Sequence, residues 1–162
     1  MANYEFTVIS NQFKTKNNEE VRKVFEDLGF EETYINSHDH LFIGSYSGAS
    51  HNDDMVVVKE KATGKVIGAY DTCYSEYDSL YDFLTSALEL SDVNEENYTE
   101  VSITEYMQDM LEDKEVFILR EVGNEKLRYS IGCATIIGKD FVDFIDLDTK
   151  IREIVEARGL SL

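Results

Sequence analysis

Acidic side chains are concentrated in one part of the chain, residues 71–115. This segment holds 14 acidic residues and a single basic one, Lys114, so its net charge is −13. The parts before and after it have net charges of −4 and −1, which together account for the total of −18. Because an unpaired carboxylate is costly to bury, the fold must place most of this segment at the solvent surface.

The same segment carries apolar side chains at helical spacing, which a disordered acidic tail lacks. A helix is predicted over residues 75–90, and a second one over residues 102–111 begins with a capping box formed by Ser102 and Glu105. The apolar stripe of the first helix consists of Leu80, Phe83, Leu84, Ala87 and Leu88. The carboxylates are therefore expected on a folded frame.

Patterns in the rest of the chain predict an α+β fold with a mainly antiparallel sheet and about four helices packed against it. The other helices are expected near residues 18–28 and after Asp148, which we interpret as an N-cap. Since no proline- or glycine-rich linker interrupts the 162 residues, we expect a single domain over 1–162. Strands are predicted at 4–9, within 33–47, and at 55–60, 65–70, 116–122, 127–137 and 141–147, with turns at Gly64, Gly123–Asn124 and Gly138–Lys139.

The sequence also bears on the compartment. The N-terminus lacks a basic region followed by an apolar core, and no run approaches the ~18 apolar residues of a membrane helix. Cys73 and Cys133 lie 60 positions apart without metal-binding spacing, and we interpret both as buried free thiols. We therefore expect a cytoplasmic protein, in its own cell or in a host cell, without membrane contact.

Candidate metal ligands occur at His38, His40 and His51. On a strand, His38 and His40 would share one face, so a small metal-dependent hydrolase is one alternative function. The run containing Asp140, Asp143 and Asp146 points side chains to both faces of a strand, and P-loop, nucleophile-elbow and dinucleotide motifs are missing from the sequence. We therefore expect no catalytic activity, no cofactor and no metal.

A binding surface is the main functional prediction. Like charges at i,i+4 destabilise a helix, and a segment selected only for solubility would contain interspersed lysines. The alternative is a solvated acidic face without a partner, with tyrosines half-buried at the edge of the core. The predicted partner-binding residues, including tyrosines spaced as on one helix face after Tyr70, are Asp71, Glu76, Asp78, Asp82, Glu89, Asp92, Glu95, Glu96, Glu100, Glu105, Asp109, Tyr74, Tyr77 and Tyr81.

The charge of this segment is comparable with that of a short DNA duplex. At one charge per about 1.7 Å, thirteen charges correspond to roughly 22 Å of duplex. With tyrosines among its carboxylates, the segment resembles phage-encoded inhibitors of bacterial defence, the anti-CRISPR and anti-restriction proteins, several of which mimic nucleic acid. The resemblance implies a basic, nucleic-acid-binding partner such as a defence nuclease. An immunity protein or antitoxin that neutralises a basic toxin is a second alternative.

The negative field also predicts which other associations to expect. It repels nucleic acid and anionic membranes, so direct binding to nucleic acid is not expected. A homo-oligomer remains compatible with the sequence, because an apolar patch on the sheet would permit one.

Overall fold

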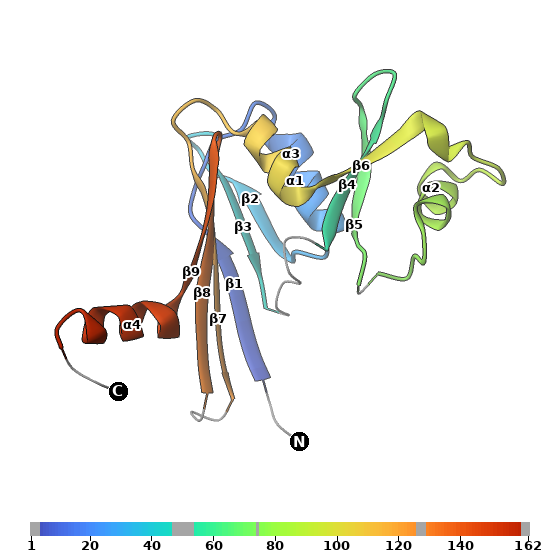
Figure 1. The fold of residues 1–162 in the computed structure, drawn as a ribbon. Helices are drawn as coiled ribbons and strands as arrows, with labels where there is room; N and C mark the ends of the chain where they lie inside the picture. Colours follow the sequence, from blue (N-terminus) through green and yellow to red (C-terminus); the bar gives the residue numbers. More distant parts are fainter. Residues whose placement is uncertain (1–3, 47–53, 74, 126–128, 160–162) are drawn as a thin grey trace.

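The computed structural model describes residues 4–46, 54–73, 75–125 and 129–159 (Figure 1). Its strands form two antiparallel sheets, with the orders β2-β3-β1-β7-β8-β9 and β5-β4-β6. The strands are β1 (Tyr4–Ser10), β2 (Glu32–Ile35), β3 (Leu41–Ser45), β4 (Met55–Glu60), β5 (Val66–Asp71), β6 (Tyr98–Ser102), β7 (Phe117–Glu125), β8 (Tyr129–Gly138) and β9 (Phe141–Asp146). The helices are α1 (Asn18–Asp27), α2 (Leu80–Leu88), α3 (Ile103–Met110) and α4 (Leu147–Glu156), with a 3-10 turn, η1 (Glu95–Asn97).

The α+β class with antiparallel strands and four helices is confirmed, and the strands divide into two sheets. Helices α1 and α3 lie between the sheets, while α2 lies beyond the three-stranded sheet (Figure 1). The apolar run of β4 explains this division, because a strand covered on both sides is apolar on both sides. Met55 and Val57 contribute to the main core with α1 and α3, whereas Val58 belongs to a second apolar cluster that includes α2.

Tyr106 joins the elements that separate the two sheets. It is buried on α3, its hydroxyl donates to Glu20 Oε1 on α1 at 3.0 Å, and Lys59 Nζ on β4 lies 5.0 Å from its ring centre. Burial, and then the nearby Glu20 carboxylate, raise the pKa of Tyr106, so the phenol stays protonated and remains a donor.

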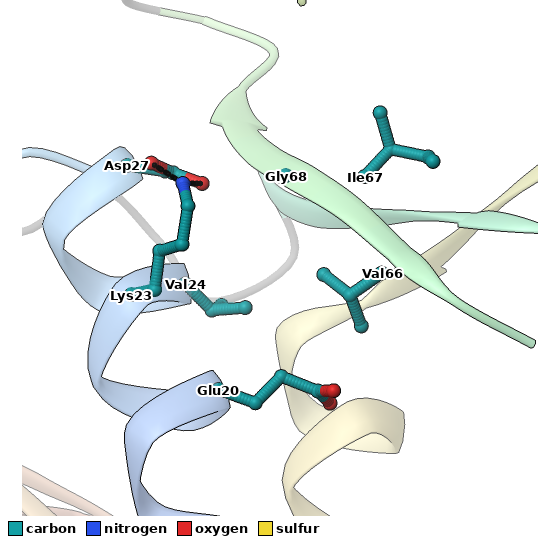
Figure 2. A pocket seen from close by; sticks show the side chains of 7 residues that line it. All are labelled: Glu20, Lys23, Val24, Asp27, Val66, Ile67 and Gly68. Atoms are coloured by element: carbon teal, nitrogen blue, oxygen red, sulfur yellow. Dashed lines mark hydrogen bonds and ion pairs between the residues drawn. The ribbon is translucent and has the colours of Figure 1, made fainter.

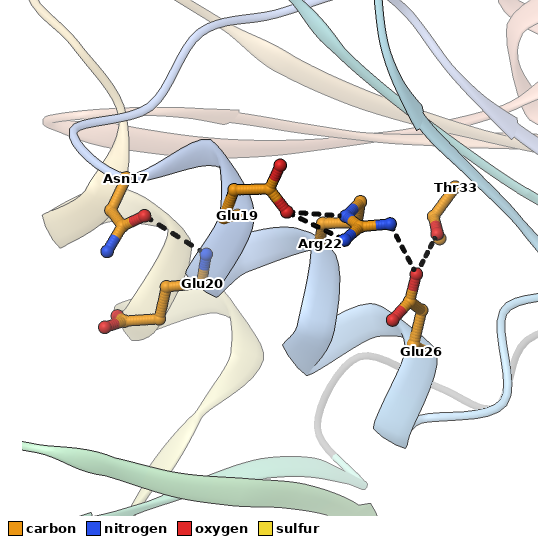
Figure 3. A network of polar contacts seen from close by, with 6 residues as sticks. All are labelled: Asn17, Glu19, Glu20, Arg22, Glu26 and Thr33. Atoms are coloured by element: carbon orange, nitrogen blue, oxygen red, sulfur yellow. Dashed lines mark hydrogen bonds and ion pairs between the residues drawn. The ribbon is translucent and has the colours of Figure 1, made fainter.

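A polar network fixes the solvent side of α1 (Figure 3). Asn17 caps the helix by accepting from the Glu20 backbone N–H at 3.2 Å, and Arg22 donates to Glu19 and Glu26. Thr33 on β2 donates to the same Glu26 carboxylate at 2.7 Å. Exposed ion pairs of this kind contribute about 0–1 kcal/mol each, so the network orients β2 on α1 more than it stabilises the fold.

Asn18, in the first turn of α1, is buried, and both polar atoms of its side chain form hydrogen bonds. Its Oδ1 accepts from both the backbone N–H and the hydroxyl of Thr15 at 2.9 Å, and its Nδ2 donates to the Asp39 carbonyl at 2.9 Å. Asn18→Ala should lower the free energy of unfolding by about 2–4 kcal/mol, because it leaves buried groups unpaired. Asn17→Ala, which removes only an exposed cap, should lower the free energy of unfolding by about 1 kcal/mol. Urea unfolding of the two variants measures both losses. Equal losses would contradict this account.

The helix prediction over residues 75–90 was too long. Ser79 is the N-cap of α2, with its hydroxyl accepting from the Asp82 N–H, and Glu89 ends the helix in the left-handed conformation. Tyr70 lies on β5 and Tyr77 precedes the helix, so the spacing of the tyrosines does not reflect one helix face. The link expected between two helices contains a strand, β6, which pairs with β4.

The extended segment predicted within 33–47 contains two strands, β2 and β3, which form a hairpin. Two other boundary predictions were wrong. The turn expected at Gly123–Asn124 lies inside β7, where both residues pair with β8. Asp146, and not Asp148, caps α4 by accepting from the Thr149 N–H at 2.8 Å. This hydrogen bond lowers the pKa of Asp146.

Candidate acidic binding surface

Helix α2 is held on the three-stranded sheet by aromatic packing. Phe83, 5 % exposed, stacks on Tyr70 of β5 with ring centres 4.8 Å apart, and Tyr77 meets Phe83 edge-on at 5.3 Å. Leu84 and Val93 are buried in the same cluster. These side chains bind the inner side of the α2 region to the sheet, which leaves its polar residues facing solvent.

Seven predicted partner-binding carboxylates are exposed on α2, the segments that flank it, and η1. In the part of the chain that the structure describes, no salt bridge joins any of them to a basic side chain. We call this set the α2 acidic surface: Glu76, Asp78, Asp82, Glu89, Asp92, Glu95 and Glu96. Their unneutralised charge makes this region the candidate binding surface.

The other four predicted carboxylates are placed differently. Asp109 on α3 pairs with Lys16 at 3.3 Å and with Lys59 at 3.9 Å, so basic residues from earlier in the chain partly neutralise it. Glu100 accepts from the Tyr70 hydroxyl, and Asp71 is half-buried and accepts from the Cys73 N–H. Glu105 is exposed on α3. Basic residues therefore neutralise part of the acidic segment predicted over residues 71–115.

Lys139 neutralises a further carboxylate at the end of that segment. It forms an ion pair with Asp113, and the hydrogen bond and charge of Lys139 lower the pKa of that carboxyl. Among the described residues, the strongly acidic segment thus divides into a part around α2 without salt bridges and a part on and after α3 that contacts lysines.

Tyr77 lies at the edge of the second apolar cluster. Tyr77 is half-buried between Tyr70 and Phe83, and Tyr81 on α2 is half-buried as well. Tyr74 lies outside the described residues. Tyr77 therefore helps to hold the α2 region in place, while part of its ring remains accessible.

His38 and His40 do not lie on a strand, contrary to the metal-site hypothesis. His38 and His40 belong to the β2–β3 turn, where Asn36 Oδ1 accepts from both of their backbone N–H groups. His51 lies outside the described residues. Among the residues described, no group of three or more His, Cys, Asp or Glu is arranged to hold a metal. Cys73 and Cys133 are free thiols, as predicted, but the prediction that both are buried was wrong, because Cys73 is exposed and Cys133 half-buried.

A small pocket lies between α1 and β5 (Figure 2). Its volume of about 60 Å³ is far below that of pockets that hold drug-sized ligands. Its polar side chains already have partners, since Lys23 pairs with Asp27 at 2.9 Å and Glu20 accepts from Tyr106. This pocket therefore provides no convincing substrate site.

Comparisons with known protein families, curated proteins and solved structures find no match to this chain. None of the helices within the described ranges is long and apolar enough to cross a membrane. The α2 acidic surface is therefore the main structural guide to the function of this chain.

Proposed function

We propose that the chain is a non-enzymatic binding protein whose α2 acidic surface occupies the nucleic-acid-binding site of a basic partner, a nuclease of a bacterial defence system. The observation that carries this proposal is the exposure of seven carboxylates on an anchored frame, without basic partners among the described residues. No Lys, Arg or His occurs anywhere between residues 66 and 113.

The physical basis is electrostatic complementarity. A groove that binds phosphates presents lysine and arginine side chains, and carboxylates held on a rigid frame can pair with them without a large ordering cost. Net charge of −18 also speeds the approach to a positively charged protein. Because exposed charges are screened, inhibition should weaken as the salt concentration rises.

A nuclease inhibition assay tests the proposal. The unmodified chain is added to a panel of restriction endonucleases and Cas nucleases, and cleavage of a cognate DNA is measured. Against a nuclease that the chain inhibits, the variant D78K/D92K/E95K should raise the inhibition constant at least about a hundredfold, because each reversal replaces attraction with repulsion.

The matched control is E19K/E32K/E112K, which changes the net charge by the same amount at exposed positions outside the α2 acidic surface. It should inhibit nearly as well as the unmodified chain. Equal inhibition by the α2 variant, or equal loss in both variants, would exclude the α2 acidic surface as the binding site. Inhibition of none of the nucleases would contradict the proposed partner class.

A further inference from the structure

The outer face of the six-stranded sheet, which points away from α1 and α3, exposes large apolar side chains. Strand alternation shows this directly, since Val8 on β1 is buried in the core while its neighbour Ile9 is exposed. Val122 on β7 is 58 % exposed and pairs across the strands with Thr7 and Gly132. The exposed apolar residues of this outer sheet face include Ile9, Val122, Phe141 and Ile145.

Helix α4 exposes an apolar stripe. Leu147, Ile151 and Ile154 recur at the spacing of one helix face, and all three are exposed. Leu147 lies over Gly132 at the start of the helix, and from there α4 extends away from the sheet (Figure 1). None of its residues is buried. An amphipathic helix normally covers an apolar surface, but among the described residues α4 leaves about half of Leu147, Ile151 and Ile154 exposed.

We propose that this chain forms a symmetric dimer in which the α4 stripe of each copy packs on the outer sheet face of the other. Both halves of the contact are present on every copy, as a two-fold interface requires. In this arrangement, each copy covers the α4 stripe and the outer sheet face of the other.

The charge distribution favours a second copy as the occupant. Residues 116–162, which contain α4 and three of the sheet's strands, carry 8 acidic and 7 basic side chains, whereas residues 1–115 have a net charge of −17. Two copies repel each other strongly elsewhere, but they can approach through this nearly neutral part. A strongly basic partner would find no net charge here to pair with.

The size of the surface also suits a dimer. With roughly half of each of seven large side chains accessible, the two halves together offer on the order of 600 Å² of apolar surface per copy. A standard interface buries about 800 Å² per partner, of which a little over half is apolar. The combined apolar area is therefore comparable with the apolar part of a standard interface.

The dimer and the nuclease inhibition are independent proposals. Helices α2 and α4 lie at opposite ends of the molecule, so dimerisation through α4 would leave both α2 acidic surfaces accessible (Figure 1).

Light scattering coupled to size-exclusion chromatography tests the dimer with the full chain. The expected mass is twice the chain mass of 18.6 kDa, and it should persist at high salt because salt screens repulsion between acidic copies. I151E/I154E should raise the dimer dissociation constant at least about a hundredfold by placing charges in an apolar contact. K150Q/R152Q makes the same change in net charge at exposed polar positions of α4 and should remain dimeric.

A mixing experiment tests whether the α4 stripe of one copy packs on the outer sheet face of the other. I151E/I154E disrupts the helix stripe, and V122E disrupts the outer sheet face, so each variant alone should be monomeric. An equimolar mixture should recover heterodimers, because one of the two contacts joins an intact stripe to an intact face. Circular dichroism should show native folding for both variants, whose substitutions are at exposed positions. A monomeric unmodified chain, a dimer unaffected by I151E/I154E, or a mixture without heterodimers would overturn the proposal.

Discussion

Replacing Phe117 with alanine should lower the free energy of unfolding by about 3–5 kcal/mol, the usual cost of truncating a buried phenylalanine. Phe117 begins β7, is 2 % exposed, and packs edge-on against Phe13 with ring centres 4.8 Å apart. Its ring also lies 5.6 Å from that of Phe25 on α1. The substitution therefore leaves a cavity where the six-stranded sheet meets the helix layer. Urea unfolding followed by circular dichroism measures the loss.

Phe144→Ala provides the matched control, since Phe144 lies on β9 of the same sheet and is 66 % exposed. Its loss should be within about 1 kcal/mol, because most of that ring is already in contact with water. Phe117→Leu, which keeps most of the volume, should cost less than Phe117→Ala. Similar losses for Phe117→Ala and Phe144→Ala would show that the cluster around Phe117 is not the main core.

The sequence predicts elements whose signals are local. Helices α1 and α3 begin within a residue or two of their expected positions, because Asn17 and Ser102 cap them and apolar residues follow at helical spacing. The β4–β5 hairpin was predicted for the same reason, since Gly64 takes the positive φ that its turn requires. Local capping and turn chemistry are sufficient in these places.

Long-range contacts limit what the sequence predicts about the fold. Strand β1 pairs with β7, more than 100 residues later, and no local pattern specifies that partner. Gly123 and Asn124 are typical turn residues, yet cross-strand pairing keeps both in β7. Tyr70 lies near the end of β5 and Tyr77 in the segment before α2, so the regular spacing of the tyrosines does not reflect one helix face.

The candidate site shows the same limit. A count of charges along the chain identifies the acidic segment, but it cannot show that Lys16 and Lys59 approach Asp109 while no lysine approaches the carboxylates near α2 among the described residues. The sequence also does not predict that the apolar stripe of α4 is exposed, because Ile151 and Ile154 have the spacing of an ordinary core-facing helix.

Phe83→Ala should weaken the proposed partner binding without changing any charge. Phe83 is buried between Tyr70 and Tyr77, and it is the aromatic side chain through which α2 stacks on β5. Its removal should lower the free energy of unfolding by about 3–5 kcal/mol, with the largest effect on α2. Amide hydrogens of α2 should exchange much faster in the variant, whereas those of β1 and β7 should change less, since local opening requires only the second apolar cluster to separate.

The functional consequence follows from rigidity. Carboxylates on a mobile α2 must be ordered again when they bind, at a cost of about 0.5–1.5 kcal/mol for each immobilised side chain, so inhibition of a susceptible nuclease should fall at least tenfold. Leu90→Ala, at an exposed position just after α2, should leave both the exchange rates and the inhibition nearly unchanged. Full inhibition by Phe83→Ala, together with fast exchange in α2, would mean that the α2 acidic surface works without a fixed frame, and the argument from rigid complementarity would fail.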